Sequence, residues 1–238
     1  MLHRILWLLL LGSVAGFALV AMTPELFSYS RLLLTGLLGL AVVSVLLLLW
    51  VWKIIRFVVL VLAVILVIAA LAVGAWWVEV RGPSEEAYIK ALQSHVGVPY
   101  VWGGEGWNGV DCSGLLRRAY VRASLADGLA HARPGCLKSA ADVWLFDASA
   151  AELRRGYGGR TRVVESGVTI NRLDHRQVAP GTLAITSNGI HCLAYLGNST
   201  WIEADPNQMS VITHKAPDSN FGWFTIHVDL VRWTTMAN

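Results

Sequence analysis

The sequence predicts an α+β domain with an antiparallel sheet, preceded by three membrane-spanning helices. Composition is the first indication, because 55% of the residues are hydrophobic and only 15% are charged, whereas soluble domains carry about a quarter charged residues. The second is that the apolar excess lies in residues 1–78. The third is that helix-like segments come first in residues 79–238 and short strand-like segments follow, an order typical of α+β domains.

The membrane region contains three apolar runs, at residues 5–22, 32–52 and 57–78. Each is long enough to cross a hydrocarbon core of roughly 30 Å as a helix. The last two runs are separated only by "KIIR". A single helix through both would be about 70 Å long at 1.5 Å per residue, so we predict two crossings joined by a tight turn, and three crossings in all.

Basic residues indicate the orientation of these helices, because loops rich in Lys and Arg stay in the cytoplasm. Arg4 precedes the first run, and Lys53 and Arg56 lie between the second and third runs. With three crossings, these residues are all on the same side of the membrane. Arg31, just before the second run, is on the other side and argues for the opposite orientation. We therefore expect a multi-pass protein of the cytoplasmic (inner) membrane, with residues 79–238 on the periplasmic or extracellular side. Two alternatives remain open: a cleaved signal peptide in place of the first helix, and an inverted topology with a cytoplasmic recycling role.

Two helices are predicted at the start of the globular part. Gly82-Pro83 interrupts the chain, and Ser84 is a suitable N-cap for a helix that Gly97 can end. The apolar side of this helix repeats at Tyr88, Leu92 and Val96. Asp111 can cap a second helix, with its apolar side at Leu115, Leu116, Ala119 and Tyr120.

Five short segments then have strand-like composition. They are "TLAIT" (182–186), "IHCLAYL" (190–196), "STWIEA" (199–204), "SVITH" (210–214) and "WFTIHVDLVRW" (223–233). Their number and spacing predict an antiparallel sheet.

Cys112 is the first candidate for chemistry, because it follows Asp111 directly at the expected start of the second helix. Unpaired N–H groups and the helix dipole at that position stabilise a thiolate and lower the pKa of the thiol. A thiolate is a competent nucleophile, but hydrolysis also needs a base.

His191 is the best-placed base, because it lies in the apolar segment "GIHCLAYLG". If the following hairpin centres on Gly197, Glu203 lies opposite His191 and on the same face of the sheet. One imidazole nitrogen then faces Glu203 and the other faces the thiol, which is the arrangement of a nucleophile, a base and an orienting group. A one-residue slip would break this arrangement. Asp205 has the same facing parity and is the nearest substitute.

The blocks "PYVWGG…DCSGLLRRAY", "APGTLAI" and "HCLAYLGNSTWIEA" resemble the NlpC-type family of papain-like cysteine peptidases over roughly residues 84–235. These enzymes are bacterial cell-wall endopeptidases that cut peptidoglycan stem peptides. The resemblance implies a papain-like fold with Cys112 as nucleophile and His191 as base. It also implies that Glu203 is the third polar residue and that Tyr100 lies beside the active site.

The resemblance also implies substrate-binding residues. Asp111 and Ser113 flank the nucleophile and are linked in the family to the amine end of the stem peptide. Apart from the resemblance, Trp102 and Trp107 are candidates for lining a substrate groove, with core packing as the alternative. The third catalytic position is more often His, Asn or Gln, and Glu is less usual. The separation of Cys112 from His191 is long, so we expect residues 125–165 to form an insertion near the cleft.

The predicted function is cleavage of an amide bond in peptidoglycan stem peptides, in particular the γ-D-glutamyl to diamino-acid link. No cofactor is implied, no Cys/His spacing predicts a metal, and no phosphate-binding loop is present. The net charge of +3 is too small to indicate nucleic-acid binding. The alternatives are a thiol acyltransferase or lipid-amide hydrolase on the same fold, a non-catalytic cell-wall-binding or regulatory protein, and a toxin role for the same hydrolase.

The remaining cysteines and histidines have ordinary structural interpretations. Cys136 and Cys192 are expected to be buried thiols, with a disulfide between them as the alternative in an oxidising compartment. His175 and His214 are expected to be structural or exposed.

Overall fold

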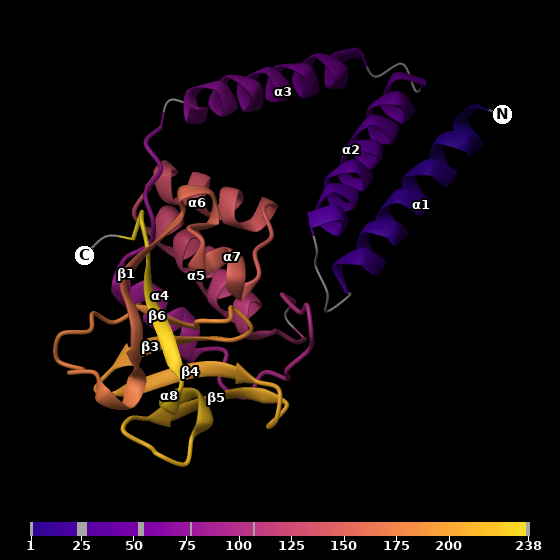
Figure 1. Cartoon of the computed structure of the whole chain (residues 1–238). Coiled ribbons are helices and arrows are strands. Elements are labelled where there is room, and N and C mark those ends of the chain that lie inside the picture. Colours follow the sequence, from indigo (N-terminus) through magenta and orange to yellow (C-terminus); the bar gives the residue numbers. More distant parts are fainter. Residues whose placement is uncertain (1, 23–27, 52–54, 77, 107, 237–238) are drawn as a thin grey trace. The chain divides into compact units, whose positions relative to one another are not determined.

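The structure is a computed structural model that describes residues 2–22, 28–51, 55–76, 78–106 and 108–236. The chain divides into two compact units, Met1–Val78 and Glu79–Asn238. Figure 1 shows the helices and strands of both units.

The first unit consists of the helices α1 (Leu2–Ala21), α2 (Ser28–Val51) and α3 (Ile55–Trp76). Helices α1 and α2 pack against each other. Two segments are long and apolar enough to cross a membrane, Arg4–Ala21 and Tyr29–Trp50, whereas the described part of α3 contributes the shorter apolar segment Val61–Ala70. We expected three such helices, and two meet this test. Lys53, on which the predicted orientation partly depends, lies outside the described residues.

The second unit contains five helices and two short 3₁₀ segments among its described residues. They are α4 (Glu85–Gln93), α5 (Cys112–Ala130), α6 (Pro134–Leu145), α7 (Ala150–Arg154), η1 (Tyr157–Gly159), η2 (Ile170–Arg172) and α8 (Gly222–Thr225). The predicted caps are confirmed, because the side chain of Ser84 accepts a hydrogen bond at the start of α4 and that of Asp111 does so at the start of α5. Helix α4 ends earlier than predicted, and Val96 is exposed in the turn that follows.

The sheet has six strands in the order β1-β6-β2-β3-β4-β5. They are β1 (Thr161–Thr169), β2 (Leu183–Thr186), β3 (Cys192–Gly197), β4 (Thr200–Asp205), β5 (Ser210–Lys215) and β6 (His227–Trp233). Every neighbouring pair is antiparallel, which confirms the predicted α+β class. The main differences are three. Strand β1 arises from a stretch with no strand prediction, Ile190 and His191 precede β3 instead of lying in it, and Trp223 and Phe224 belong to α8 rather than to the last strand.

Two apolar cores lie on opposite faces of this sheet. Successive side chains of β3 point to opposite faces of the sheet. Cys192 and Ala194 belong to the core that includes residues of α4 and α5, and Leu193 and Tyr195 belong to the second core. Residues 125–165 supply the end of α5, then α6, α7, η1 and the start of β1. Their buried members in the first core are Val143, Ala148, Ala150, Leu153 and Tyr157.

Candidate active site

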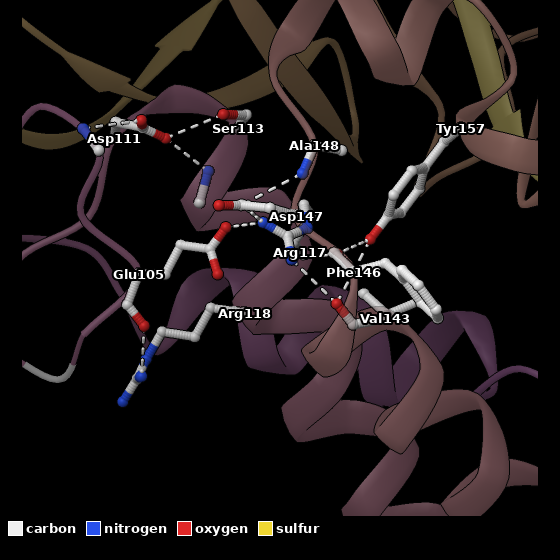
Figure 2. A network of polar contacts seen from close by, with 12 residues as sticks. Glu105, Asp111, Ser113, Arg117, Arg118, Val143, Phe146, Asp147, Ala148 and Tyr157 are labelled. Atoms are coloured by element: carbon white, nitrogen blue, oxygen red, sulfur yellow. Dashed lines mark hydrogen bonds and ion pairs between the residues drawn. The ribbon is translucent and has the colours of Figure 1, made fainter. Parts of the chain in front are cut away.

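The start of α5 is fixed by the carboxylate of Asp111 (Figure 2). One oxygen accepts hydrogen bonds from the Gly114 N–H at 2.6 Å and the Ser113 hydroxyl at 3.0 Å, and the other accepts one from the Gly103 N–H at 3.0 Å. Burial, together with the neighbouring Cys112, raises the pKa of Asp111 to about 6 although these hydrogen bonds oppose the rise. The Gly-rich loop lies so close that a Cβ at Gly114 would be 2.1 Å from the Gly104 carbonyl oxygen.

Arg117 ties α5 to two other segments (Figure 2). Its side chain is 1% exposed and forms ion pairs with Glu105 of the Gly-rich loop and Asp147 of the segment after α6. It also donates hydrogen bonds to the carbonyl oxygens of Val143 at 2.9 Å and Phe146 at 2.6 Å. The loop before the nucleophile and the chain after α6 therefore share one buried guanidinium as their anchor.

Cys112 is the first residue of α5, and its side chain is buried. Cys192 and His191 are the polar groups that act most strongly on its thiol. The hydrogen bond from Cys192, followed by the contacts with His191, holds the pKa of the Cys112 thiol well below its usual range, against the effect of burial. The structure thus places Cys112 in surroundings that favour a thiolate.

His191 lies between Cys112 and Glu203. Its Nε2 is hydrogen-bonded to Oε2 of Glu203, and Cys112 is the other group that acts on the imidazole. Burial lowers the pKa of His191, but the hydrogen bonds with Cys112 and Glu203 outweigh it and raise this pKa to about 9. Burial raises the pKa of Glu203, and the hydrogen bond with His191 opposes that rise. The three groups together suit a thiolate–imidazolium pair backed by a carboxylate.

The hairpin that brings His191 to Glu203 has a different register from the one we expected. Tyr195 pairs with Trp201, so the turn centres on position 198 rather than 197. Continuing this pairing places Asp205 opposite His191 and Glu203 two residues away. A shift of two residues keeps every side chain on its own face, so Glu203 still reaches the imidazole.

The aromatic residues of the site have unequal positions. Trp223 of α8 stacks on the His191 ring, with ring centroids 4.2 Å apart and planes at 18°. The sequence did not predict this contact, because Trp223 begins the strand-like segment at residues 223–233. Tyr100 is buried, and its burial, with Cys112 as the next cause, raises its pKa to about 12. Trp102, by contrast, is 78% exposed, and Trp107 lies outside the described residues.

The other cysteines and His175 have separate surroundings. All three cysteines are free thiols. The Cys136 thiol donates to the Gly82 carbonyl oxygen at 3.3 Å, whereas Cys192 contacts Cys112. His175 accepts a hydrogen bond at Nε2 from the indole N–H of Trp201 at 3.2 Å, as a structural histidine would.

One group of side chains among the described residues has the composition of a metal site. One ligand atom from each of Glu203, Asp205 and His214 lies within 4.8 Å of the other two. Both carboxylates are buried, and His214 is half-buried. No zinc-type Cys/His spacing indicated this group in the sequence.

Comparison with known proteins gives one family. The sequence profile of the NlpC/P60 family matches residues 97–226, and no curated protein matches the chain. Similar solved structures include the peptidoglycan hydrolase RipB of Mycobacterium tuberculosis (22% identity, TM-score 0.37, 61% of this chain and 63% of that one). A NlpC/P60 family protein of Bacillus cereus has 16% identity and a TM-score of 0.43 over 65% of this chain and 41% of that one. NlpC2 of Trichomonas vaginalis has 21% identity and a TM-score of 0.40 over 66% and 50%. The chain thus spans less than two thirds of each of these proteins.

Proposed function

The chain belongs to the NlpC/P60 family, and on this premise we propose that it is a membrane-anchored cysteine hydrolase that cleaves an amide bond in peptidoglycan stem peptides. The observation that carries the proposal is the contact series from Cys112 through His191 to Glu203. A nucleophile, a base and an orienting carboxylate in mutual contact are the groups that acyl transfer requires.

The Cys112 thiolate begins the reaction by attacking the amide carbonyl carbon. The carbonyl oxygen becomes an oxyanion, and the backbone N–H of Cys112 at the helix start is a suitable donor to it. Tyr100 is buried beside the thiol with a raised pKa, so its hydroxyl stays protonated and can donate a second hydrogen bond. A carbon–sulfur bond forms, and the tetrahedral intermediate is held by these donors.

His191 completes both halves of the reaction. The imidazolium gives its proton to the leaving amine as the carbon–nitrogen bond breaks, which produces an acyl-enzyme. The neutral imidazole then takes a proton from water, and the hydroxide attacks the thioester carbon. The carbon–sulfur bond breaks, the carboxylic acid leaves, and the thiolate–imidazolium pair is restored. Glu203 orients the ring throughout and stabilises its charged form, and the stacked Trp223 holds the ring plane and excludes water from one side.

Asp111 and Ser113 support a stem peptide with a free amine as the substrate. The Asp111 carboxylate is largely buried beside the nucleophile, and the Ser113 hydroxyl is bonded to it. A negative group at this position attracts an ammonium group and disfavours an acyl chain, which favours the γ-D-glutamyl to diamino-acid link over a lipid amide.

We further propose that α3 is a third crossing that places the hydrolase unit outside the cytoplasmic membrane. Its 22 residues span about 33 Å at 1.5 Å per residue. Alkaline phosphatase fused after the last residue of the full chain is then active in bacterial cells, because it folds outside the cytoplasm. An inactive fusion that is present in normal amount would indicate two crossings and a cytoplasmic hydrolase unit.

The hydrolase proposal is tested with the full-length protein in detergent micelles and defined muropeptides, with mass spectrometry of the products. We expect a pair of fragments whose masses identify the cleaved bond, and no fragments with Cys112→Ala. Cys136→Ala is the matched control, because it removes a buried thiol that lies outside the site, and it should leave cleavage intact. Intact muropeptides with the folded wild-type protein would contradict the proposal.

The role of Asp111 is tested with the same muropeptides after acetylation of their free amine. We expect the acetylated substrate to be cleaved much more slowly, with the loss mainly in KM. Equal cleavage of both substrates would remove the argument for amine recognition and favour the lipid-amide or acyltransferase alternatives.

A further inference from the structure

A polar group lies behind the catalytic histidine on the face formed by β4 and β5. In this antiparallel pair Trp201 faces His214 and Glu203 faces Ile212. Because directly opposed residues share a face and residues two apart along a strand do too, Glu203, Asp205 and His214 all point to one side of the sheet. It is the side on which Glu203 meets His191.

Two atoms of this group are buried without a partner in the described part of the chain. They are Oε1 of Glu203 and Nε2 of His214. The side chain of Glu203 is 1% exposed, and its other oxygen is taken by His191. Buried polar atoms almost always have a partner in native proteins. One of these two atoms is a carboxylate oxygen and the other is an imidazole nitrogen, and both can donate an electron pair to a metal ion. Their lack of partners indicates that such an ion binds here.

The group has access to solvent and a fixed imidazole. A cavity of about 550 Å³ is lined by Asp205 and His214, together with Asn207, Gln208, Asn220 and residues 221–223, 225 and 226. The His214 ring stacks on Phe221 with centroids 3.7 Å apart, which holds the ring plane. A small ion and its water can therefore reach Asp205 and His214 through this cavity.

We propose that Glu203, Asp205 and His214 bind one first-row divalent transition-metal ion, for which Zn²⁺ is the probe. Two carboxylate oxygens and one imidazole nitrogen are donors that Zn²⁺ accepts at about 2.0–2.2 Å, with water in the remaining position. Mg²⁺ and Ca²⁺ prefer oxygen ligands throughout, so the imidazole disfavours them. Two ligands of one tetrahedral zinc ion lie about 3.3–3.6 Å apart. Ligand atoms that are at most 4.8 Å apart must therefore approach each other by up to about 1.2–1.5 Å, through rotation of their side chains.

The ion would share Glu203 with the catalytic histidine. A cation on Oε1 withdraws charge from the carboxylate that stabilises the His191 imidazolium through Oε2, and it adds a positive charge nearby. We therefore expect Zn²⁺ to inhibit hydrolysis reversibly and a chelator to restore it. This expectation rests on the proposed hydrolase function, whereas metal binding itself does not, so the two can fail separately.

The test measures binding rather than activity. Full-length protein in detergent micelles, first treated with a chelator, is dialysed against Zn²⁺ and its bound metal is counted, and Co²⁺ is used for absorption spectra. We expect one ion per chain in the wild type and in Cys112→Ala, and at least 10-fold weaker binding in Asp205→Asn and His214→Gln. His131→Gln is the matched control, because it removes an exposed histidine at the end of α5.

The Co²⁺ spectrum separates this site from the thiol of the active centre. We expect ligand-field bands and no thiolate-to-cobalt charge-transfer band, because the donors are oxygen and nitrogen only. Binding that is lost in Cys112→Ala, or a charge-transfer band from sulfur, would place the ion on Cys112 and His191 and overturn the proposal. Binding that is unchanged in both Asp205→Asn and His214→Gln would overturn it too, and the wild-type spectrum decides the matter if those variants do not fold.

Discussion

The two sides of the candidate active site are held in different ways. On the α5 side, Asp111 accepts three hydrogen bonds and Arg117 joins two acidic side chains and two carbonyl groups. On the strand side, Glu203 holds His191 through one oxygen, and its other oxygen has no partner among the described residues. The proposed nucleophile, Cys112, therefore lies in a densely bonded region, whereas the proposed base, His191, is held by a carboxylate that has one oxygen still available for bonding.

This difference separates stability from chemistry. Removing a group on the α5 side leaves several buried partners unpaired, so it lowers the free energy of unfolding. Removing charge on the strand side affects one catalytic contact, so it lowers the rate while the fold survives. The four changes below test this division, from the largest expected effect to the smallest.

Arg117→Met should have the largest effect. It leaves Glu105 and Asp147 without their shared counter-charge, and loss of one partner of a buried ion pair costs about 3–5 kcal/mol of unfolding free energy. Urea unfolding of the full-length protein in micelles, followed by tryptophan fluorescence, measures this loss. Arg122→Met is the control on the same helix, because Arg122 is exposed and donates a hydrogen bond to the exposed Ser94 hydroxyl at 3.1 Å. Equal stability of the two variants would mean that the Arg117 network does not hold the loop.

Glu203→Gln should affect the rate and leave the fold intact. The amide keeps the size of the side chain but loses the charge that stabilises the His191 imidazolium. We expect kcat/KM for muropeptides to fall by about 100-fold, within the usual range for general acid–base groups. A chelator is present throughout, so that no metal ion binds to Glu203. Unchanged kcat/KM would assign the orienting role to Asp205, which the β3–β4 pairing places opposite His191.

Trp223→Ala should have an effect of about 10-fold, on kcat. The indole covers one face of the His191 ring, and its loss admits water and frees the ring, at a cost similar to that of one aromatic contact. Trp102→Ala provides the comparison, because an exposed groove residue should act on KM and leave kcat unchanged. A change in KM alone for Trp223→Ala would make Trp223 a substrate contact instead of a support for the base.

The sequence predicted the parts of the site that depend on local rules. Asp111 was identifiable as an N-cap because a short acidic side chain before an apolar helical repeat is the usual helix start. The contact between His191 and Glu203 was predicted from alternation, and it survived an error in the register because the error was two residues and parity was preserved. The resemblance to NlpC-type peptidases is confirmed by the family match at residues 97–226.

The parts that the sequence did not predict depend on tertiary context. Strand β1 lies at the sheet edge with most of its side chains exposed, so it lacks the apolar alternation that marks a half-buried strand. Trp223 was misassigned because an aromatic run suits a strand, and only the packing of α8 against His191 distinguishes it. The approach of His214 to Glu203 and Asp205 requires the β4–β5 pairing, which no local motif specifies.

Cys192→Val should have the smallest effect, and it tests how the thiol on the α5 side is tuned. The hydrogen bond from Cys192 is the largest cause of the lowered pKa of Cys112, and valine fills a similar volume without a donor. Loss of this hydrogen bond raises the pKa of Cys112, so a smaller fraction of Cys112 is present as thiolate at any pH below that pKa. We expect slower alkylation by iodoacetamide near pH 6 and the same limiting rate at high pH. Cys192 itself stays a thiol because burial raises its pKa, so the alkylation reports Cys112, with Cys136→Val as the control. A pH profile that matches the wild type would mean that His191, without Cys192, sets the pKa of the Cys112 thiol, and the strand side would then act on this thiol through a single residue.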